Sequence, residues 1–275
     1  MASAQPPVTS LSGCGKIRES GVYNLDTFAI NAPAGDCITI SASNVVLNLD
    51  GATITGSGSG AGIHIAAKTS NNFIEGRSAT ISGFGEGIEI DGSKATVENV
   101  TLASNSDVGL LLKAATQAAV SNLTATDNTN DGIRVEKGSY NIIGGALSIT
   151  DNGRYGIWLM STSCDNVGGF FIEDNALAGI YMGCSSSGPG GVACKANAVG
   201  KSNSIFNGRA QASSPGSQSY GIVIDIGNDS NRITNVSSPS SYEKLDLDDE
   251  NPACAHNAWF GHGLIFSPSP IDCIH

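Results

Sequence analysis

Apolar and polar residues alternate along this chain in short stretches that recur at a nearly constant distance. The clearest stretch holds a glycine, an aliphatic residue, a variable residue and a second aliphatic residue, as in Gly87-Ile-Glu-Ile and Gly132-Ile-Arg-Val. Alternation with a period of two is typical of a β-strand with one buried face, and no copy is followed by a helical pattern. The phrase occurs seven times, starting at Gly62, Gly87, Gly109, Gly132, Gly156, Gly179 and Gly221.

The spacing of these phrases predicts the architecture. Successive glycines lie 25, 22, 23, 24, 23 and 42 residues apart. Repeats of this length indicate a solenoid, in which each unit buries its apolar face only against the next. About 23 residues with two or three short strands fit one coil of a parallel β-helix, so we predict an all-β fold of this kind. An asparagine keeps the same step, and its stacked amides should hydrogen-bond along the axis. The four positions are Asn105, Asn128, Asn152 and Asn175.

The ends of the chain and one internal segment depart from the repeat. Because the end of a solenoid exposes unpaired backbone groups, something should cover it. We predict one domain over residues 1–275, with an N-terminal cap at 1–36, coils at 37–238 and a C-terminal cap at 239–275. Within the coils, residues 184–219 are rich in Ser, Gly and Pro and are predicted to form an insertion loop.

Seven cysteines follow this division of the chain. None has the two-residue spacing of a zinc site, so disulfides are the better interpretation. The expected pairs are Cys14 with Cys37, Cys184 with Cys194, and Cys254 with Cys273. Cys164 is left over and is expected to be a free thiol at a bend. The disulfides would tie the two caps.

Charge and hydropathy limit the kinds of binding partner that the protein can have. A net charge of -11 without a basic run argues against nucleic acid and anionic lipid. No apolar run reaches the roughly 18 residues of a membrane span. The start, Met-Ala-Ser-Ala-Gln-Pro-Pro, lacks the apolar core of a signal peptide, as in a mature secreted protein. We expect a secreted protein, extracellular or periplasmic, and the sequence leaves its oligomeric state open.

Several segments resemble secreted right-handed parallel β-helix proteins of the pectin-lyase-like superfamily. The likeness covers nearly the whole chain and implies a right-handed β-helix. The superfamily includes polysaccharide lyases, hydrolases and uronate epimerases, so the resemblance also implies a polysaccharide partner. No catalytic motif of the superfamily is present, because the Asp-Pro-His signature and the paired aspartates are both missing. The segments that carry the resemblance are Gly13-Cys-Gly, Gly21-Val-Tyr-Asn-Leu, Cys37-Ile-Thr-Ile, Asn44-Val-Val-Leu-Asn-Leu-Asp-Gly, Asp248-Asp-Glu-Asn-Pro-Ala-Cys, Asn257-Ala-Trp-Phe-Gly and Cys273-Ile-His.

The repeat also predicts surface columns, because residues of the same phase stack about 4.8 Å apart in neighbouring coils. The variable position of the phrase should point outward, giving His64, Glu89, Leu111, Arg134, Trp158, Tyr181 and Val223. Two residues further along, the outward set includes Asp91, Lys113 and Glu136, and Asp131 and Tyr155 precede their glycines. Aromatic rings pack on the CH faces of sugars, and charged groups bind hydroxyl or uronate groups. We therefore expect Trp158, Tyr181, Tyr155 and Lys113 to bind a polysaccharide.

Catalytic chemistry stays open between two schemes. A lyase or epimerase needs a base and a group that neutralises the uronate carboxylate, whereas a hydrolase needs two carboxylates about 5 to 10 Å apart. The candidate catalytic residues are Arg134, Asp131, Glu136 and Glu89. No cofactor or metal ligand set is assigned, although these acidic side chains would allow a calcium ion. A base role for His64 beside Glu89 is conceivable, but a lone surface histidine is commoner.

The alternative interpretation is a non-catalytic structural or surface-interaction protein. Outward positions are polar in any soluble solenoid, and exposed cross-strand ion pairs contribute only tenths of a kcal/mol, about 0.2 to 1 each. Whether the protein is an enzyme is therefore left open by the sequence.

Overall fold

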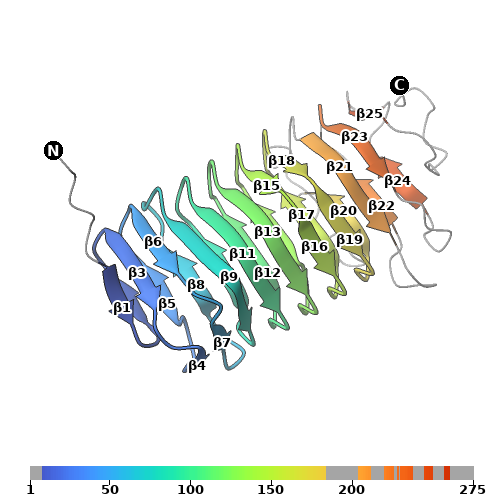
Figure 1. The fold of residues 1–275 in the computed structure, drawn as a ribbon. Helices are drawn as coiled ribbons and strands as arrows, with labels where there is room; N and C mark the ends of the chain where they lie inside the picture. The colour runs from blue at the N-terminus through green and yellow to red at the C-terminus, as the bar shows by residue number, and fades with distance from the viewer. Residues whose placement is uncertain are drawn as a thin grey trace.

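A computed structural model describes residues 8–183, 204–211, 220–225, 228, 230–237, 245–249 and 257–260. The described residues form an all-β solenoid in which every paired strand runs parallel to its neighbours. Figure 1 shows these strands stacked side by side from β1 at the blue end to β24 at the orange end. The predicted parallel β-helix is confirmed. Among the described residues, no helix is long and apolar enough to span a membrane.

One wall of the solenoid is a ten-stranded sheet that takes one strand from each coil. It contains all seven copies of the glycine phrase, and their aliphatic positions lie in register from Ile63 to Ile222. In order, its strands are β2 (Gly15–Ile17), β5 (Ile38–Ile40), β8 (Ala61–Ile65), β10 (Glu86–Ile90), β12 (Val108–Lys113), β14 (Ile133–Glu136), β17 (Tyr155–Met160), β20 (Ala178–Met182), β22 (Tyr220–Ile224) and β24 (Leu245–Asp249).

The remaining strands form a 15-stranded sheet that bends along its length. Its longest strands change direction at left-handed residues such as Asn99 (φ 57°) and Asn122 (φ 49°), so the sheet supplies two walls. Its strands are β1 (Val8–Leu11), β3 (Gly21–Leu25), β4 (Ala29–Asn31), β6 (Val45–Asn48), β7 (Thr53–Thr55), β9 (Phe73–Ser82), β11 (Thr96–Ala103), β13 (Ala119–Thr126), β15 (Ile142–Gly144), β16 (Leu147–Thr150), β18 (Asn166–Gly168), β19 (Phe170–Glu173), β21 (Ser204–Gln211), β23 (Arg232–Ser237) and β25 (Ala258–Phe260).

The core lies inside these walls and follows the alternation read from the sequence. Inward positions such as Ile88, Leu110 and Ile157 have no exposed area. Each stacks on the same position of the next coil, so the apolar column is continuous along the axis. Burial of stacked aliphatic side chains is the main favourable term in such a fold.

The repeated glycine is needed because the repeated asparagine of the next coil packs against it. The amide of Asn105 donates to the Oδ1 of Asn128 at 2.9 Å, and Asn128 donates in the same way to Asn152 at 2.9 Å. This confirms the predicted asparagine ladder. A Cβ on Gly109 would lie 2.6 Å from the oxygen of Gly132 and 3.0 Å from the Nδ2 of Asn128. Glycine is therefore required because the phrase packs directly against the ladder.

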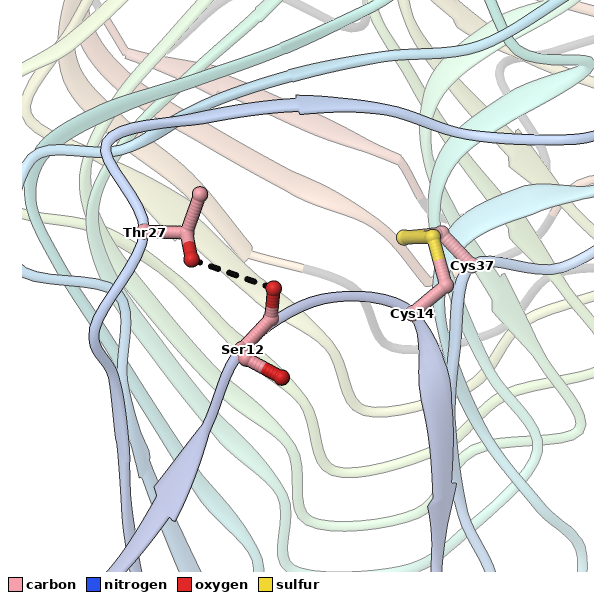
Figure 2. Close-up of a disulfide and its surroundings, with 4 residues drawn as sticks. All are labelled: Ser12, Cys14, Thr27 and Cys37. Atoms are coloured by element: carbon pink, nitrogen blue, oxygen red, sulfur yellow. Dashed lines mark hydrogen bonds between the residues drawn. A yellow bond between two sulfur atoms is a disulfide. The ribbon is translucent and has the colours of Figure 1, made fainter.

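At the N-terminal end, the disulfide between Cys14 and Cys37 is confirmed and joins two successive coils (Figure 2). The Thr27 hydroxyl donates to the Ser12 carbonyl at 3.1 Å nearby. In the described part of the predicted cap, β1 and β3 pair with each other and β2, β3 and β4 pair with the next coil. This part of the segment therefore continues the sheets as coils of the solenoid.

The other expectations about cysteines and ends are only partly covered. Cys164 is a free thiol of intermediate exposure, as expected. Cys184, Cys194, Cys254 and Cys273 lie outside the described residues. In the predicted insertion, β21 adds a strand to the 15-stranded sheet. In the predicted C-terminal cap, β24 extends the ten-stranded sheet and β25 extends the 15-stranded sheet.

Candidate functional site

The outward column predicted from the repeat is present on the ten-stranded sheet. Glu89 lies opposite His64 and Leu111, and Arg134 lies opposite Leu111 and Trp158. The column continues through Tyr181 and Val223. Along the axis it divides into three groups of side chains, which differ in burial and in charge.

The group at the C-terminal coils is an aromatic cluster of Tyr155, Trp158, Ala178, Tyr181 and Val223, which lie outside the main core. Trp158 is only 5% exposed, Tyr155 5% and Tyr181 7%. The rings of Tyr155 and Tyr181 stack at 4.5 Å with an interplanar angle of 5°. These outward residues therefore form a second, small apolar core.

Polar contacts complete the aromatic cluster. The Arg154 guanidinium lies 4.7 Å from the centre of the Trp158 ring, and that of Arg134 lies 5.3 Å away. The Trp158 Nε1 donates to the Gly183 oxygen at 3.2 Å, and the Tyr181 hydroxyl donates to Asp225 at 2.8 Å. The ring faces that we expected to bind a sugar are thus covered within the protein. This burial does not support a role for Tyr155, Trp158 and Tyr181 as a stacking platform.

The middle group is an ion cluster of Arg134, Asp107, Asp131 and Glu136. Arg134 donates from Nε to Asp131 at 2.7 Å and from both terminal nitrogens to Asp107 at 3.2 and 2.8 Å. Its contact with Glu136 is longer, at 3.9 Å. Asp131 is fully buried and also accepts from the Tyr155 backbone at 3.3 Å. The structure therefore brings together three of the four predicted catalytic residues.

The pKa shifts in this ion cluster are those of a structural ion-pair network between Arg134 and two aspartates. Burial opposes the charge of Arg134, but Asp131 and Asp107 outweigh it and raise the pKa of the guanidinium. Burial likewise works against ionisation of Asp107, yet hydrogen bonds from Arg134 and Asn130 lower its pKa. At Asp131 burial dominates and raises the pKa despite Arg134. An arginine held charged between two carboxylates cannot accept a proton, and all three of its nitrogens already donate to Asp131 or Asp107.

The group at the N-terminal coils is the polar patch, made of Asp36, His64, Glu89, Asp91 and Lys113. His64 Nδ1 lies 3.0 Å from Asp36 Oδ2, and its Nε2 lies 3.5 Å from Asp91 Oδ2. Lys113 donates to Glu89 at 3.2 Å, and this contact raises the pKa of the lysine. The Lys113 side chain is 54% exposed, so the polar patch opens to solvent at this residue.

Three residues of the polar patch converge closely enough to share a cation. One donor atom from each of His64, Glu89 and Asp91 lies within 4.8 Å of the other two. The His64 Nε2 and the Asp91 Oδ1 are buried atoms without a hydrogen-bond partner. In the part of the chain that the structure describes, no other group of three His, Cys, Asp or Glu residues converges in this way.

Asp91 was expected in the outward set, whereas Asp36 was not among the residues that the sequence singled out. Asp36 lies directly before Cys37, and its Oδ1 accepts from the Ala61 backbone at 3.0 Å in the following coil. The contact with His64 crosses 28 positions of the sequence. The usable signal was the coil spacing, which places Asp36 just before β5 and hence beside the start of β8.

Fold and site together define a parallel β-helix protein with one polar, solvent-open patch on its ten-stranded sheet. Residues 8–177 match the family described as periplasmic copper-binding protein (NosD). Because the match covers more than half of the chain, the protein belongs to the NosD family. The expected membership of the pectin-lyase-like β-helix group is confirmed by this match and by the fold.

Several solved structures share the fold at low sequence identity. The Dettilon tailspike protein is 15% identical with a TM-score of 0.67, over 91% of this chain and 62% of its own. The periplasmic alginate epimerase AlgG is 11% identical with a TM-score of 0.60, over 91% and 67%. The mannuronan C-5 epimerase AlgE6 A-module of Azotobacter vinelandii is 11% identical with a TM-score of 0.51, over 94% and 90%. No curated protein matches the chain significantly.

Proposed function

We propose that the protein binds a polysaccharide outside the cytoplasm, along the outward face of the ten-stranded sheet, with the polar patch as its contact site. The observation that carries this proposal is the cluster of polar side chains His64, Glu89 and Lys113 on β8, β10 and β12. Glu89 lies opposite His64, and Lys113, two positions beyond Leu111, contacts Glu89 at 3.2 Å. These side chains are partly exposed, whereas Trp158, Tyr181 and Val223, at the outward position of the later coils, are buried.

The geometry suits a linear polymer. Adjacent parallel strands lie about 4.8 Å apart, so a chain running along the axis meets a new side chain at every coil. Hydroxyl groups of a sugar can pair with carboxylates and with the imidazole, and Lys113 offers an exposed cation to an acidic sugar. Arg134 is already bound to two aspartates, which leaves Lys113 as the better cation for a uronate group.

Similar proteins support the choice of partner and location. The names of AlgG and the AlgE6 module refer to alginate and mannuronan, which are acidic polysaccharides. The tailspike is longer than this chain, which spans 62% of its length. AlgG and the NosD family are both described as periplasmic. We therefore propose a periplasmic or extracellular location and an acidic glycan as partner.

The experiment is a binding screen of acidic and neutral polysaccharides by affinity electrophoresis, with natural protein and the variant Lys113→Ala. Natural protein should be retained by at least one acidic glycan, and the variant should lose most of this retention. Ultraviolet absorbance of unsaturated ends and the release of reducing ends, recorded in parallel, report whether binding leads to cleavage. Absence of retention across the screen would contradict the proposal and favour a structural protein.

A second candidate function is copper binding, as in the description of the NosD family. The specific observation in its favour is the pair of unpartnered buried atoms, His64 Nε2 and Asp91 Oδ1. An imidazole with carboxylate oxygens suits Cu(II), whereas Cu(I) selects thiolate and thioether ligands. The residues present therefore fit a divalent copper ion held by His64, Glu89 and Asp91. Titration of the protein with Cu(II), followed by electron paramagnetic resonance, tests whether the protein binds this ion.

A further inference from the structure

We propose that His64, Glu89 and Asp91 form a binding site for one divalent transition-metal ion, with Asp36 orienting the histidine. This inference rests on the second candidate function and deepens it, because it adds the histidine tautomer, the orienting role of Asp36 and the wider class of metal. It does not depend on whether the protein binds a polysaccharide.

The first support is the arrangement around His64. Its Nδ1 lies 3.0 Å from Asp36 Oδ2, so a proton on Nδ1 makes a charge-assisted hydrogen bond with that carboxylate. When Nδ1 carries the only ring proton, Nε2 offers a lone pair to a metal ion. A carboxylate that binds the second nitrogen of a histidine in this way is the usual partner of a metal-ligating histidine.

The second support is that the lone pair of Nε2 faces another acceptor. Nε2 lies 3.5 Å from Asp91 Oδ2, which is longer than a good hydrogen bond. Nε2 and the Asp91 Oδ1 are both buried and lack a hydrogen-bond partner. With the proton on Nδ1 alone, the Nε2 lone pair faces a carboxylate, which is unfavourable unless a cation lies between them, and both buried acceptors then lack a partner.

Charge and donor type identify the class of ion. Two carboxylates and a neutral imidazole carry a charge that balances one divalent cation. Lys113 occupies only Oε1 of Glu89, so Oε2 is left for a metal. Calcium prefers six to eight oxygen ligands, and the imidazole therefore favours Zn(II) or Cu(II) over calcium.

The backbone holds the ligands at fixed positions. His64 and Glu89 lie opposite each other on paired strands, and Asp91 directly follows β10. Asp36 is held by the Ala61 backbone amide at 3.0 Å and is followed by Cys37 of the disulfide. A rigid scaffold that presents three donors in this way needs little reorganisation to bind an ion.

The test is a Zn(II) titration of chelator-treated protein by isothermal calorimetry, because Zn(II) has no redox reaction with the Cys164 thiol. To remove the other imidazoles, His256, His262 and His275 are first replaced by Gln, and all variants are made in this background. One equivalent of Zn(II) should bind. His64→Gln and Asp91→Asn should each weaken binding more than tenfold, and Asp36→Asn about 10- to 100-fold, the effect usual for the partner of a ligating histidine.

The matched control is Asp50→Asn, which removes the same charge from a carboxylate that binds Arg77 at 2.7 Å on the other sheet. It should leave the affinity for Zn(II) unchanged. In the Cu(II) complex, electron paramagnetic resonance should show one coupled imidazole nitrogen, and that signal should be absent in His64→Gln.

The outcomes separate the site from the function. If Zn(II) and Cu(II) bind but His64→Gln and Asp91→Asn behave like Asp50→Asn, the assigned site is wrong and metal binding stands. If neither ion binds the folded protein, both the site and the proposed copper binding are wrong. Circular dichroism on every variant confirms that a lost signal does not come from unfolding.

Discussion

Gly109 illustrates how strictly single positions are constrained in this repeat. Its backbone approaches Gly132 and Asn128 so closely that a methyl group would overlap the Gly132 oxygen. The sequence showed that glycine and asparagine recur with one step, and hence that both belong to the repeat. It did not show that one requires the other, because that contact joins residues of neighbouring coils and appears only once the coils are stacked.

Replacing Gly109 by alanine tests this contact. The added Cβ would lie 2.6 Å from the oxygen of Gly132, so either the backbone or the asparagine ladder must shift. Overpacking of this kind costs about 1–3 kcal/mol of unfolding free energy. Gly15→Ala is the matched control, since its Cβ meets nothing within 4 Å, and it should be neutral or slightly stabilising. Urea denaturation of both variants measures the difference, and equal stabilities would contradict the explanation of the repeat.

Asp165 is a second residue whose effect depends on its place in a column. It is fully buried and accepts from the Asn141 backbone at 2.7 Å, as Asn141 itself accepts from Ala118 at 2.8 Å. Burial raises the pKa of the Asp165 carboxyl to about 6, against an ordinary value of 3.8. The folded protein therefore binds a proton more tightly than the unfolded chain, and stability falls as pH rises from about 4 to 6.

Asp165→Asn should therefore stabilise the protein at neutral pH and change little near pH 4. Two pKa units correspond to at most about 3 kcal/mol above pH 6. Thermal unfolding at pH 4 and at pH 7.5 measures the difference between natural protein and variant. Asp151→Asn, at an exposed position of the surface, is the control and should not show this pH dependence. If the variant is no more stable than natural protein at pH 7.5, ionisation of the buried Asp165 carboxyl does not destabilise the fold, and the prediction is wrong.

At the scale of the strands, the repeat predicts which side chains point outward but not whether they are exposed to solvent. The alternation in β12, β14, β17 and β20 correctly assigned which side chains point outward. Outward residues nevertheless became buried where large rings and guanidinium groups of adjacent coils lie against one another, as at Trp158. Whether an outward column is solvated depends on these contacts between coils, which a period of two does not encode.

The ion cluster on β14 and just before β12 and β14 gives a prediction at this scale. Arg134→Gln would leave the fully buried Asp131 without its main cationic partner, which should cost about 3–5 kcal/mol. Adding Asp131→Asn should recover part of this loss, because no buried charge then remains unpaired. Lys113→Gln, which breaks the exposed pair with Glu89, is the control and should cost less than about 1 kcal/mol. Chemical denaturation of the three variants measures these costs; a small effect of Arg134→Gln would instead favour a functional role for the arginine.

At the scale of the whole molecule, the outward face of the ten-stranded sheet has buried regions that stabilise the fold and one accessible region. The aromatic cluster and the ion cluster bury outward residues of the later coils, while the polar patch stays accessible on β8, β10 and β12. The fold was predictable because every coil repeats the same physical requirement. The site was less predictable, because it depends on where the repeat varies, and Asp36 meets His64 only across successive coils.

The central claim is that ligand binding and stability map to different coils of this face. The most direct measurement compares Lys113→Ala with Trp158→Ala for both properties, using glycan retention and urea denaturation. The account predicts that Lys113→Ala loses retention at low salt with stability changed by less than about 0.5 kcal/mol. Trp158→Ala should lose about 3–5 kcal/mol of stability and, while folded, keep its retention. The opposite result, in which the folded Trp158→Ala variant loses retention and Lys113→Ala keeps it, would contradict the account and return the binding site to the aromatic rings.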